Sequence, residues 1–339
     1  MKKIKTENAI GTALCHDVTQ IIPGVMKGSI FKKGHIITEA DIPTLLDIGK
    51  HHVYVYDLND GYIHENDAAN HMAAAVRGGG IKLTDVSEGK ISFKAEYDGV
   101  LKIKREAVLE LNSQPEICLA VINPDRAVKS GSLLGGCRVI PLAVEKDVIE
   151  HFENTAAKFG GSIMEVRPFK PFRIGVVTTG EEIRSGRIKD AFGDVLKNKA
   201  AETGSVITKQ IFAGDDRTFI TQSINELLNS DADMVYVTGG MSVDPDDVTP
   251  GAIRDCGGEV ITYGAPVLPG AMFMLSYVNG KPVVGLPSCV MYAKRTIYDL
   301  IIPRIITGER ISRNDIVKLS IGGQCEGCET CRYPQCGFI

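Results

Sequence analysis

Residues 176–182 read Val-Val-Thr-Thr-Gly-Glu-Glu, a β-branched apolar run that ends in hydroxyls, a glycine and two acids. Residues 235–242 (Val-Tyr-Val-Thr-Gly-Gly-Met-Ser) and 283–288 (Val-Val-Gly-Leu-Pro-Ser) repeat this change from apolar to glycine-containing sequence. Helix-like stretches separate the three runs, which is typical of strands in a parallel sheet. We therefore expect one ligand crevice at the carboxyl edge of an open α/β sheet, where strand ends, glycine backbone and helix N-termini converge.

The alternation of strand and helix patterns is regular from residue 171 onward. Apolar runs predict strands over 173–177, 205–211, 234–238, 272–277 and 281–285. Amphipathic spacing predicts helices over 192–203, 218–228, 249–256 and 291–306. The predicted fold class is α/β, an open and mostly parallel sheet with helices on both faces, preceded by a smaller β-rich α+β region.

Changes in composition predict four parts in the chain. Residues 1–80 are interpreted as an α+β module, and residues 81–170 as a β-rich module with a linker helix. Residues 171–310 form the predicted α/β domain, and residues 311–339 form a cysteine-rich tail.

Bulk composition limits the classes of function. The 339 residues are 44% hydrophobic and 24% charged, with a net charge of −4. They contain no basic stripe interleaved with aromatics, which disfavours a nucleic-acid partner. Residues 1–8 are not followed by the apolar segment of a signal peptide, and no apolar run reaches the roughly 18 residues that span a bilayer. We expect a cytoplasmic protein without a membrane partner.

Acidic side chains cluster in the loops that follow the predicted strands. Carboxylates beside backbone that suits a phosphate imply a bridging divalent cation, because they would otherwise repel an anionic ligand. Any one of these acids is more simply explained as a helix cap, whereas the set favours a ligand site. The set is Glu181, Glu182, Asp190, Asp215, Asp216, Asp244, Asp246 and Asp247.

The order of these motifs resembles the molybdenum-cofactor biosynthesis (molybdopterin-binding, MoeA/MogA-like) domain. This domain is shared by molybdopterin molybdenumtransferases, molybdopterin adenylyltransferases and amidohydrolase-linked competence-damage proteins. The resemblance covers roughly residues 171–308 and is carried by 178–183 (Thr-Thr-Gly-Glu-Glu-Ile), 186–190 (Gly-Arg-Ile-Lys-Asp), 215–216 (Asp-Asp), 238–242 (Thr-Gly-Gly-Met-Ser), 247–250 (Asp-Val-Thr-Pro), 269–270 (Pro-Gly) and 285–287 (Gly-Leu-Pro).

The resemblance implies a pterin dithiolene bound at the sheet edge, with its phosphate on residues 239–242 and its pterin near residues 286–288. Asp190, Asp215 and Asp247 would act on Mg²⁺, molybdate or nucleotide phosphate as the catalytic residues. The implied cofactor-binding residues are Thr179, Gly180, Glu181, Glu182, Thr238, Gly239, Gly240, Ser242, Pro269, Gly270, Leu286, Pro287 and Ser288.

This chain departs from the family pattern in three loops. Glu181 stands where the family often has aspartate, and Asp244 replaces a glycine. Residues 288–290 read Ser-Cys-Val where the family has Gly-Asn-Pro. Losing two glycines changes how closely the backbone can approach a ligand, so these departures bear on catalysis more than on binding.

Four cysteines crowd into the C-terminal tail, at Cys325, Cys328, Cys331 and Cys336. In a reducing compartment this spacing favours a metal over disulfides. Three evenly spaced cysteines resemble the ligands of an iron–sulfur cluster, although the fourth lies one residue further on than in the ferredoxin-like run. A Cys₄ zinc site fits as well, and a metal-free tail is the remaining alternative, so the metal stays open.

The resulting functional prediction is a molybdopterin-binding protein of molybdenum-cofactor biosynthesis that inserts or transfers molybdenum with Mg²⁺, using molybdopterin and molybdate. One alternative is a non-catalytic carrier or maturation factor that delivers cofactor to an apo-molybdoenzyme. A second alternative is nucleotide-directed adenylyl transfer or hydrolysis on the same fold. From the resemblance we also expect a homo-oligomer.

Overall fold

The computed structural model describes residues 2–22, 26–55 and 61–338. Contacts divide the chain into two compact units, the first made of residues 1–94, 103–122 and 133–165, and the second of 95–102, 123–132 and 166–339. The four-part division made from composition stays a prediction.

Small sheets and one layer of helices build the first unit. Its four-stranded sheet has the order β6-β7-β11-β9, and α2 packs on β11 and against α4. The strands are β1 Lys2–Lys5, β2 Val18–Ile22, β3 Met26–Phe31, β4 His52–Val55, β5 Tyr62–His64, β6 Ile81–Leu83, β7 Ile91–Ala95, β9 Ile117–Val121, β11 Leu133–Val139 and β12 Ala143–Glu145. The helices are η1 Thr6–Asn8, α1 Asp41–Asp47, α2 Glu65–Val76, α3 Arg105–Leu111 and α4 Lys146–Lys158.

The second unit contains a six-stranded sheet of order β15-β14-β16-β19-β18-β17. A three-stranded sheet of order β10-β8-β13 precedes it in the chain, formed by β8 Gly99–Ile103, β10 Ala127–Val128 and β13 Met164–Pro168. The strands of the larger sheet are β14 Arg173–Thr178, β15 Val206–Phe212, β16 Met234–Thr238, β17 Glu259–Tyr263, β18 Met274–Val278 and β19 Lys281–Leu286. The helices are α5 Glu181–Arg184, α6 Phe192–Ala201, α7 Arg217–Leu228, α8 Thr249–Asp255, η2 Ser288–Met291, α9 Ile297–Ile306 and α10 Arg313–Lys318.

Parallel pairing in this sheet confirms the predicted fold class. Among β15, β14, β16 and β19, neighbouring strands pair in parallel. β18 pairs antiparallel with β19, and β17 pairs antiparallel with β18. The last residues of three strands lie side by side, because Thr178 pairs with Thr238 and Thr238 pairs with Leu286. The loops that follow these strands therefore begin at one edge of the sheet.

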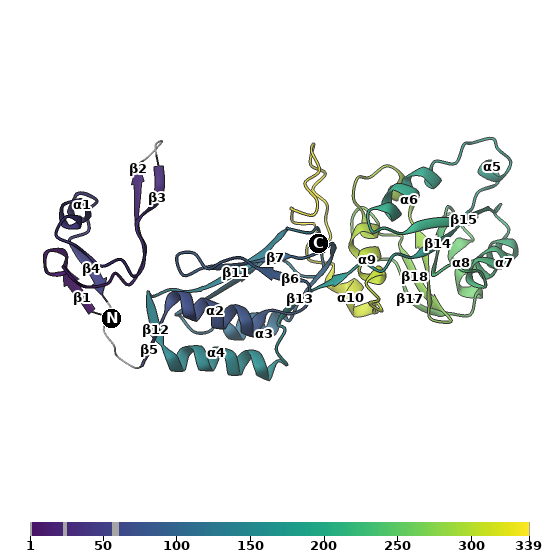
Figure 1. The fold of residues 1–339 in the computed structure, drawn as a ribbon. Coiled ribbons are helices and arrows are strands. Elements are labelled where there is room, and N and C mark those ends of the chain that lie inside the picture. Colours follow the sequence, from purple (N-terminus) through teal and green to yellow (C-terminus); the bar gives the residue numbers. More distant parts are fainter. Residues whose placement is uncertain (1, 23–25, 56–60, 339) are drawn as a thin grey trace. The chain divides into compact units, whose positions relative to one another are not determined.

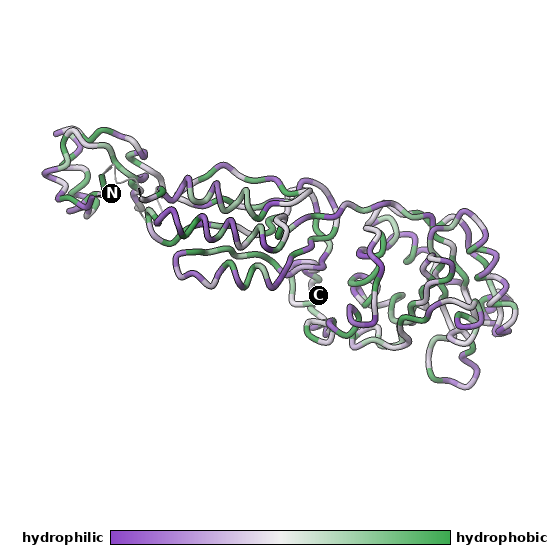
Figure 2. The backbone as a smooth tube through the Cα atoms, turned by 90° about the horizontal axis from the view of Figure 1, so that it is seen from below, coloured by the Kyte–Doolittle hydropathy of each residue, from purple (hydrophilic) through white to green (hydrophobic). Residues whose placement is uncertain are grey.

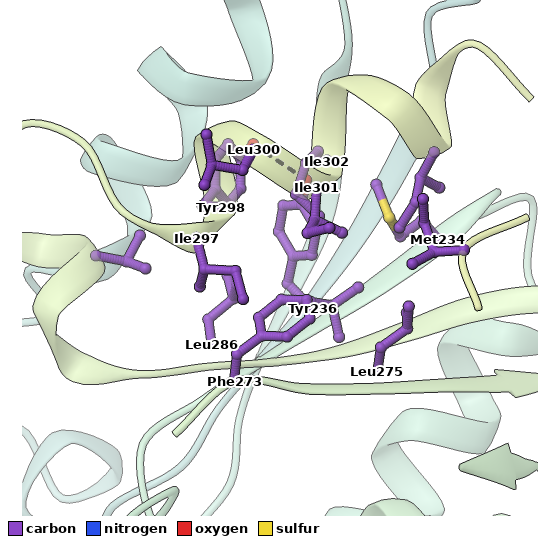
Figure 3. Packing of buried hydrophobic residues seen from close by; sticks show 14 of the residues in the cluster. Met234, Tyr236, Phe273, Leu275, Leu286, Ile297, Tyr298, Leu300, Ile301 and Ile302 are labelled. Atoms are coloured by element: carbon purple, nitrogen blue, oxygen red, sulfur yellow. Dashed lines mark hydrogen bonds between the residues drawn. The ribbon is translucent and has the colours of Figure 1, made fainter. Parts of the chain in front are cut away.

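Each face of the sheet carries its own hydrophobic core. Alternate strand residues point to opposite faces, so Val176 and Tyr236 pack with α6 and α9, whereas Val177 and Val237 pack with α7 and α8. Figure 3 shows the first of these cores, where the hydroxyls of Tyr236 and Tyr298 meet at 3.1 Å. In Figure 1, α7 and α8 lie together on one side of the strands. Helices cover both faces, as predicted.

Three elements near the C-terminus differ from the sequence prediction. Helix α9 begins at Ile297 rather than at residue 291, because Thr296 and Asp299 form a reciprocal capping box. Strand β17 and helix α10 were not predicted, and α10 is capped in the same way by Ser312 and Asp315. Short elements of this kind carry too few residues for a clear periodicity.

Hydrophobic and hydrophilic residues alternate along much of the trace in Figure 2, whereas all ten residues of α9 are buried. Among the described residues, no helix is both long enough and apolar enough to cross a membrane.

A buried charge network supports the C-terminal helices. The guanidinium of Arg304, itself only 3% exposed, pairs with Glu309 at 2.6 Å and with Asp315 at 3.0 Å. Burial by itself raises the pKa of the Asp315 carboxyl, but hydrogen bonds from Ser312 and Arg304 outweigh it and hold this pKa at about 2, below the ordinary 3.8. Because the folded state favours the ionised carboxylate, the network stabilises the fold above pH 3.8.

We expect Asp315→Asn to lower the free energy of unfolding by about 1–2 kcal/mol at neutral pH. The difference from the wild type should shrink as the pH falls from about 4 toward about 2, where Asp315 becomes protonated in the folded protein. Urea denaturation over this pH range measures both effects. Asp194→Asn removes an exposed carboxylate and should leave stability unchanged. A gap between wild type and Asp315→Asn that is constant with pH would contradict the assigned ionisation.

Candidate functional site

The site is built where the connections of the sheet diverge. The chain leaves β14 toward β15 on one side and leaves β16 through α8 toward β17, at the other edge of the sheet, which makes the gap between β14 and β16 a topological switch point. Thr179 N donates to Thr238 O at 2.8 Å and ties the two strand ends together. We call residues 179–182, 239–242 and 247–249 the switch-point loops.

Glycine is required twice at the end of β16. Gly239 has φ of +88° and Gly240 has φ of +55°. A Cβ on Gly239 would lie 2.6 Å from both the carbonyl and the hydroxyl oxygen of Thr179, and one on Gly240 would lie 2.8 Å from the hydroxyl of Thr249. The backbone conformation and the close approach therefore both exclude larger residues.

In the part of the chain that the structure describes, four successive backbone N–H groups are unpaired in the loop after β16. Within residues 61–338, no protein acceptor receives the N–H groups of Gly239, Gly240, Met241 and Ser242. The buried hydroxyls of Thr179 and Thr249 lie 3.3 Å apart beside them. Successive unused N–H groups next to hydroxyls suit an anionic group such as a phosphate.

Asp247 is the predicted catalytic acid that lies beside these donors. Its Oδ1 is 3.6 Å from the position of a Cβ on Gly240, and its Oδ2 accepts a hydrogen bond from Asp244 N at 3.3 Å. The Asp247 side chain is half-buried.

Asp190 and Asp215 are engaged by the protein itself. Asp190 accepts hydrogen bonds from the backbone of Phe192 and Gly193 at 2.9 and 3.0 Å and from Gln210 Nε2 at 2.8 Å. Asp215 accepts from Glu181 N at 3.1 Å. In this structure both carboxylates position loops, which is the helix-cap alternative for the single acids.

The acids after β14 lie at the protein surface. Glu181 pairs with Arg184 at 3.0 Å, and both Glu181 and Glu182 are exposed. Gly180 precedes them with φ of +122°, a conformation that favours glycine. These residues are close to the switch point in the chain, and among the described residues neither glutamate forms a hydrogen bond or an ion pair with Asp247.

The two remaining predicted loops reach the same edge. Met274 pairs antiparallel with Gly285, so residues 269–273 extend past the end of β19. Gly270 is packed against Ile297, where a Cβ would lie 2.5 Å from the Ile297 side chain. The Leu286 side chain is wholly buried in the core, so only its backbone borders the edge, while Ser288 is exposed.

Sequence reasoning missed three side chains at this edge. Thr249 borders Gly240, Gln210 Nε2 bridges Asp190 and Thr178 Oγ1, and Tyr263 donates to Ser242 O at 3.1 Å. Thr249 lies within one of the motifs that carry the family resemblance, so this motif was the signal that could have identified it. Nothing in the sequence pattern pointed to Tyr263, because β17 was not predicted.

The described side chains that could bind a metal ion do not already lie together in this structure. In the described part of the chain, no three His, Cys, Asp or Glu side chains are arranged to hold a metal ion. This includes the acids of the switch-point loops and the four tail cysteines. Mg²⁺ is commonly held by one or two carboxylates together with substrate phosphates and water, and Asp247 beside the unused N–H groups fits that role.

The comparison with known families agrees with this geometry. Residues 175–307 match the family model of a probable molybdopterin binding domain. The match supports a molybdopterin-binding domain of the molybdenum-cofactor biosynthesis family within residues 175–307. Residues 3–57 match a domain family of unknown function.

Curated relatives share part of this domain. A CinA-like protein from Mycobacterium marinum is 30% identical over 90 residues, which are 26% of this chain and 21% of the relative. A putative molybdopterin biosynthesis protein from Methanocaldococcus jannaschii is 29% identical over 124 residues, 32% of this chain and 31% of the relative. The chain thus spans about a fifth to a third of the curated relatives that it matches.

Solved structures to which this chain is similar include MoaB from Thermus thermophilus, described as a molybdopterin biosynthesis enzyme. It is 16% identical and covers 41% of this chain and 98% of its own, with a TM-score of 0.34. The molybdopterin biosynthesis protein MoeA from Pyrococcus horikoshii is 16% identical and covers 91% of this chain and 74% of its own, with a TM-score of 0.33.

The fit of Gly239 against Thr179 can be tested by comparing two glycines of positive φ. Gly239→Ala places a Cβ against a backbone oxygen, whereas the Cβ of Gly280→Ala, at φ of +81°, meets nothing within 4 Å. We expect Gly280→Ala to cost about 1 kcal/mol of unfolding free energy and Gly239→Ala about 3 kcal/mol. Urea denaturation measures both values. Equal costs would mean that positive φ alone accounts for the glycine.

Proposed function

We propose that the α/β unit binds molybdopterin at the switch-point loops and acts in the assembly of the molybdenum cofactor. The observation that carries the proposal is the run of four unused N–H groups at residues 239–242, beside a glycine pair that admits no side chain. The match to the family model of a probable molybdopterin binding domain supports the choice of ligand. A terminal phosphate is the part of this ligand that these donors suit.

The remaining parts of the ligand follow from the edge of the sheet. The pterin would extend toward residues 286–288, where Ser288 is exposed at the surface. Asp247 would hold Mg²⁺ together with a phosphate or molybdate oxygen, and the cation would neutralise charge on the reacting oxygens. Asp190 and Asp215 would keep the surrounding backbone in place through the hydrogen bonds that they accept.

Insertion or transfer of molybdenum is the reaction that we propose for this arrangement. In the insertion step the two dithiolene sulfurs would form two Mo–S bonds while one oxo group of molybdate leaves as water with the two thiol protons. A cation and an array of backbone donors would stabilise the negative charge on the molybdate oxygens during this exchange. The carrier alternative requires the same binding and no turnover. Catalysis with molybdopterin, molybdate and Mg²⁺ separates the two, because a carrier would retain the ligands unchanged.

Anaerobic calorimetry with purified molybdopterin tests the binding site. We expect Asp247→Asn to weaken binding about tenfold or more in the presence of Mg²⁺, because a charged metal ligand is lost, and to have little effect without Mg²⁺.

Asp246→Asn is the matched control for this experiment. It removes the same charge from the same loop, but the Asp246 side chain is exposed rather than half-buried. Its binding should stay within about twofold of the wild type. Equal weakening by both variants would mean that Asp247 acts only through the overall charge of the loop. Binding of ATP without any binding of molybdopterin would overturn the proposal in favour of the nucleotide alternative.

A further inference from the structure

All four tail cysteines line one cavity on the α/β unit. The cavity has a volume of about 420 Å³, and Cys325, Cys328, Cys331 and Cys336 contribute to its wall. Apolar groups from the domain complete it, among them Pro269, Ala293 and Phe338. Residues far apart in the chain thus line one open cavity together with the cysteines, and we call this space the cysteine cavity.

The tail is attached to the domain on both sides of the cysteines. Before them, Leu268 N donates to Gly323 O and Cys325 N donates to Leu268 O, both at 2.8 Å. After the third cysteine, Tyr333 donates its hydroxyl to Asp299 O at 2.8 Å, and Phe338 is only 4% exposed in the core. These contacts fix both ends of the cysteine segment on the domain. Only the middle of the segment is left to rearrange.

The middle of the segment is able to close around a metal centre. No helix or strand is formed between residues 325 and 336, and Cys328 and Cys331 are exposed. Metal binding commonly gathers thiolates that are apart in the apo protein, so a set not yet arranged at ligating distance is compatible with a site. The two fixed ends reduce the conformational entropy that such closure costs.

Charged side chains of both signs line the cavity. Lys294, Arg295 and Arg332 lie in its wall together with Glu326 and Glu329. Arg295 is paired with Glu202 at 2.7 Å and with Asp299 at 2.8 Å, whereas Lys294 is held by a hydrogen bond of 2.9 Å to Glu329 O. Lys294 and Arg332 are therefore the cations of the wall that suit a centre that becomes anionic once its cysteines are thiolates.

We propose that the cysteine cavity holds an iron–sulfur cluster ligated by Cys325, Cys328, Cys331 and Cys336. A single zinc ion bonds its sulfurs at about 2.3 Å and would leave most of such a cavity empty, whereas a cluster is a larger body. The spacing of the first three cysteines also favours a cluster, as do the apolar and cationic groups in the wall of the cavity. This inference does not depend on molybdopterin binding at the switch-point loops.

Anaerobic reconstitution of the full chain with iron and sulfide tests the proposal. We expect about four iron and four sulfide per chain, with the absorption of an iron–sulfur cluster. Cys328→Ser and Cys331→Ser should each lose most of the cluster. Cys256→Ser, which replaces a half-buried thiol outside the tail, should retain it and serves as the control for thiol loss and for folding.

Several results would overturn the cluster. Binding of one zinc per chain without sulfide would assign the thiols to zinc instead. Iron and sulfide that persist in Cys328→Ser and Cys331→Ser would place the cluster elsewhere. Absence of metal after reconstitution, with an intact fold by circular dichroism, would leave a metal-free tail.

A second measurement tests the position of the cluster in the cavity. The double variant Lys294→Gln/Arg332→Gln removes two positive charges from the wall and keeps every cysteine. We expect the cluster to form and its reduction potential to fall, because positive charge stabilises the reduced form. A potential equal to that of the wild type would contradict a cluster beside Lys294 and Arg332.

Discussion

The common register of three parallel strands is the constraint on which the α/β unit depends. Parallel hydrogen bonding sets Thr178 opposite Thr238 and Thr238 opposite Leu286, so three loops start at the same edge. The divergence of the connections at β14 and β16 then leaves backbone donors without helix or strand partners. Glycine at residue 239 follows from this register, because the neighbouring strand end occupies the space of a side chain.

Asp299 links the core to the periphery of the same unit. Its carboxylate accepts hydrogen bonds from Lys199 at 3.0 Å, from Arg295 at 2.8 Å and from Thr296 N at 2.7 Å, and its carbonyl accepts from Tyr333. One residue therefore caps α9, joins it to α6 and anchors the tail. A buried carboxylate needs several donors of this kind, because an unpaired charge in the interior is costly.

The sequence predicted the parts of the fold that local pattern controls. Strand 234–238 was correct to the residue, and the hairpin across Asn279 has the positive φ of +50° that such turns require. The local sequence pattern did not predict where α9 begins, because the start of this helix depends on a cap. It also did not predict strand β17, which is defined by its pairing to β18. The sequence left open whether Asp190 and Asp215 cap helices or act on a ligand, because the two kinds of carboxylate look alike in sequence. In the structure both accept hydrogen bonds from backbone N–H groups, and their catalytic role stays a prediction.

By itself the sequence determined the order of strands and helices, the family resemblance and the presence of a glycine pair and four clustered cysteines, because these are properties of neighbouring residues. Only the tertiary structure decided which groups meet. Gly240 approaches Thr249, Tyr263 reaches Ser242, and the tail pairs with Leu268 through contacts between distant segments. Such contacts depend on sheet register and on burial against the core, neither of which a local pattern contains.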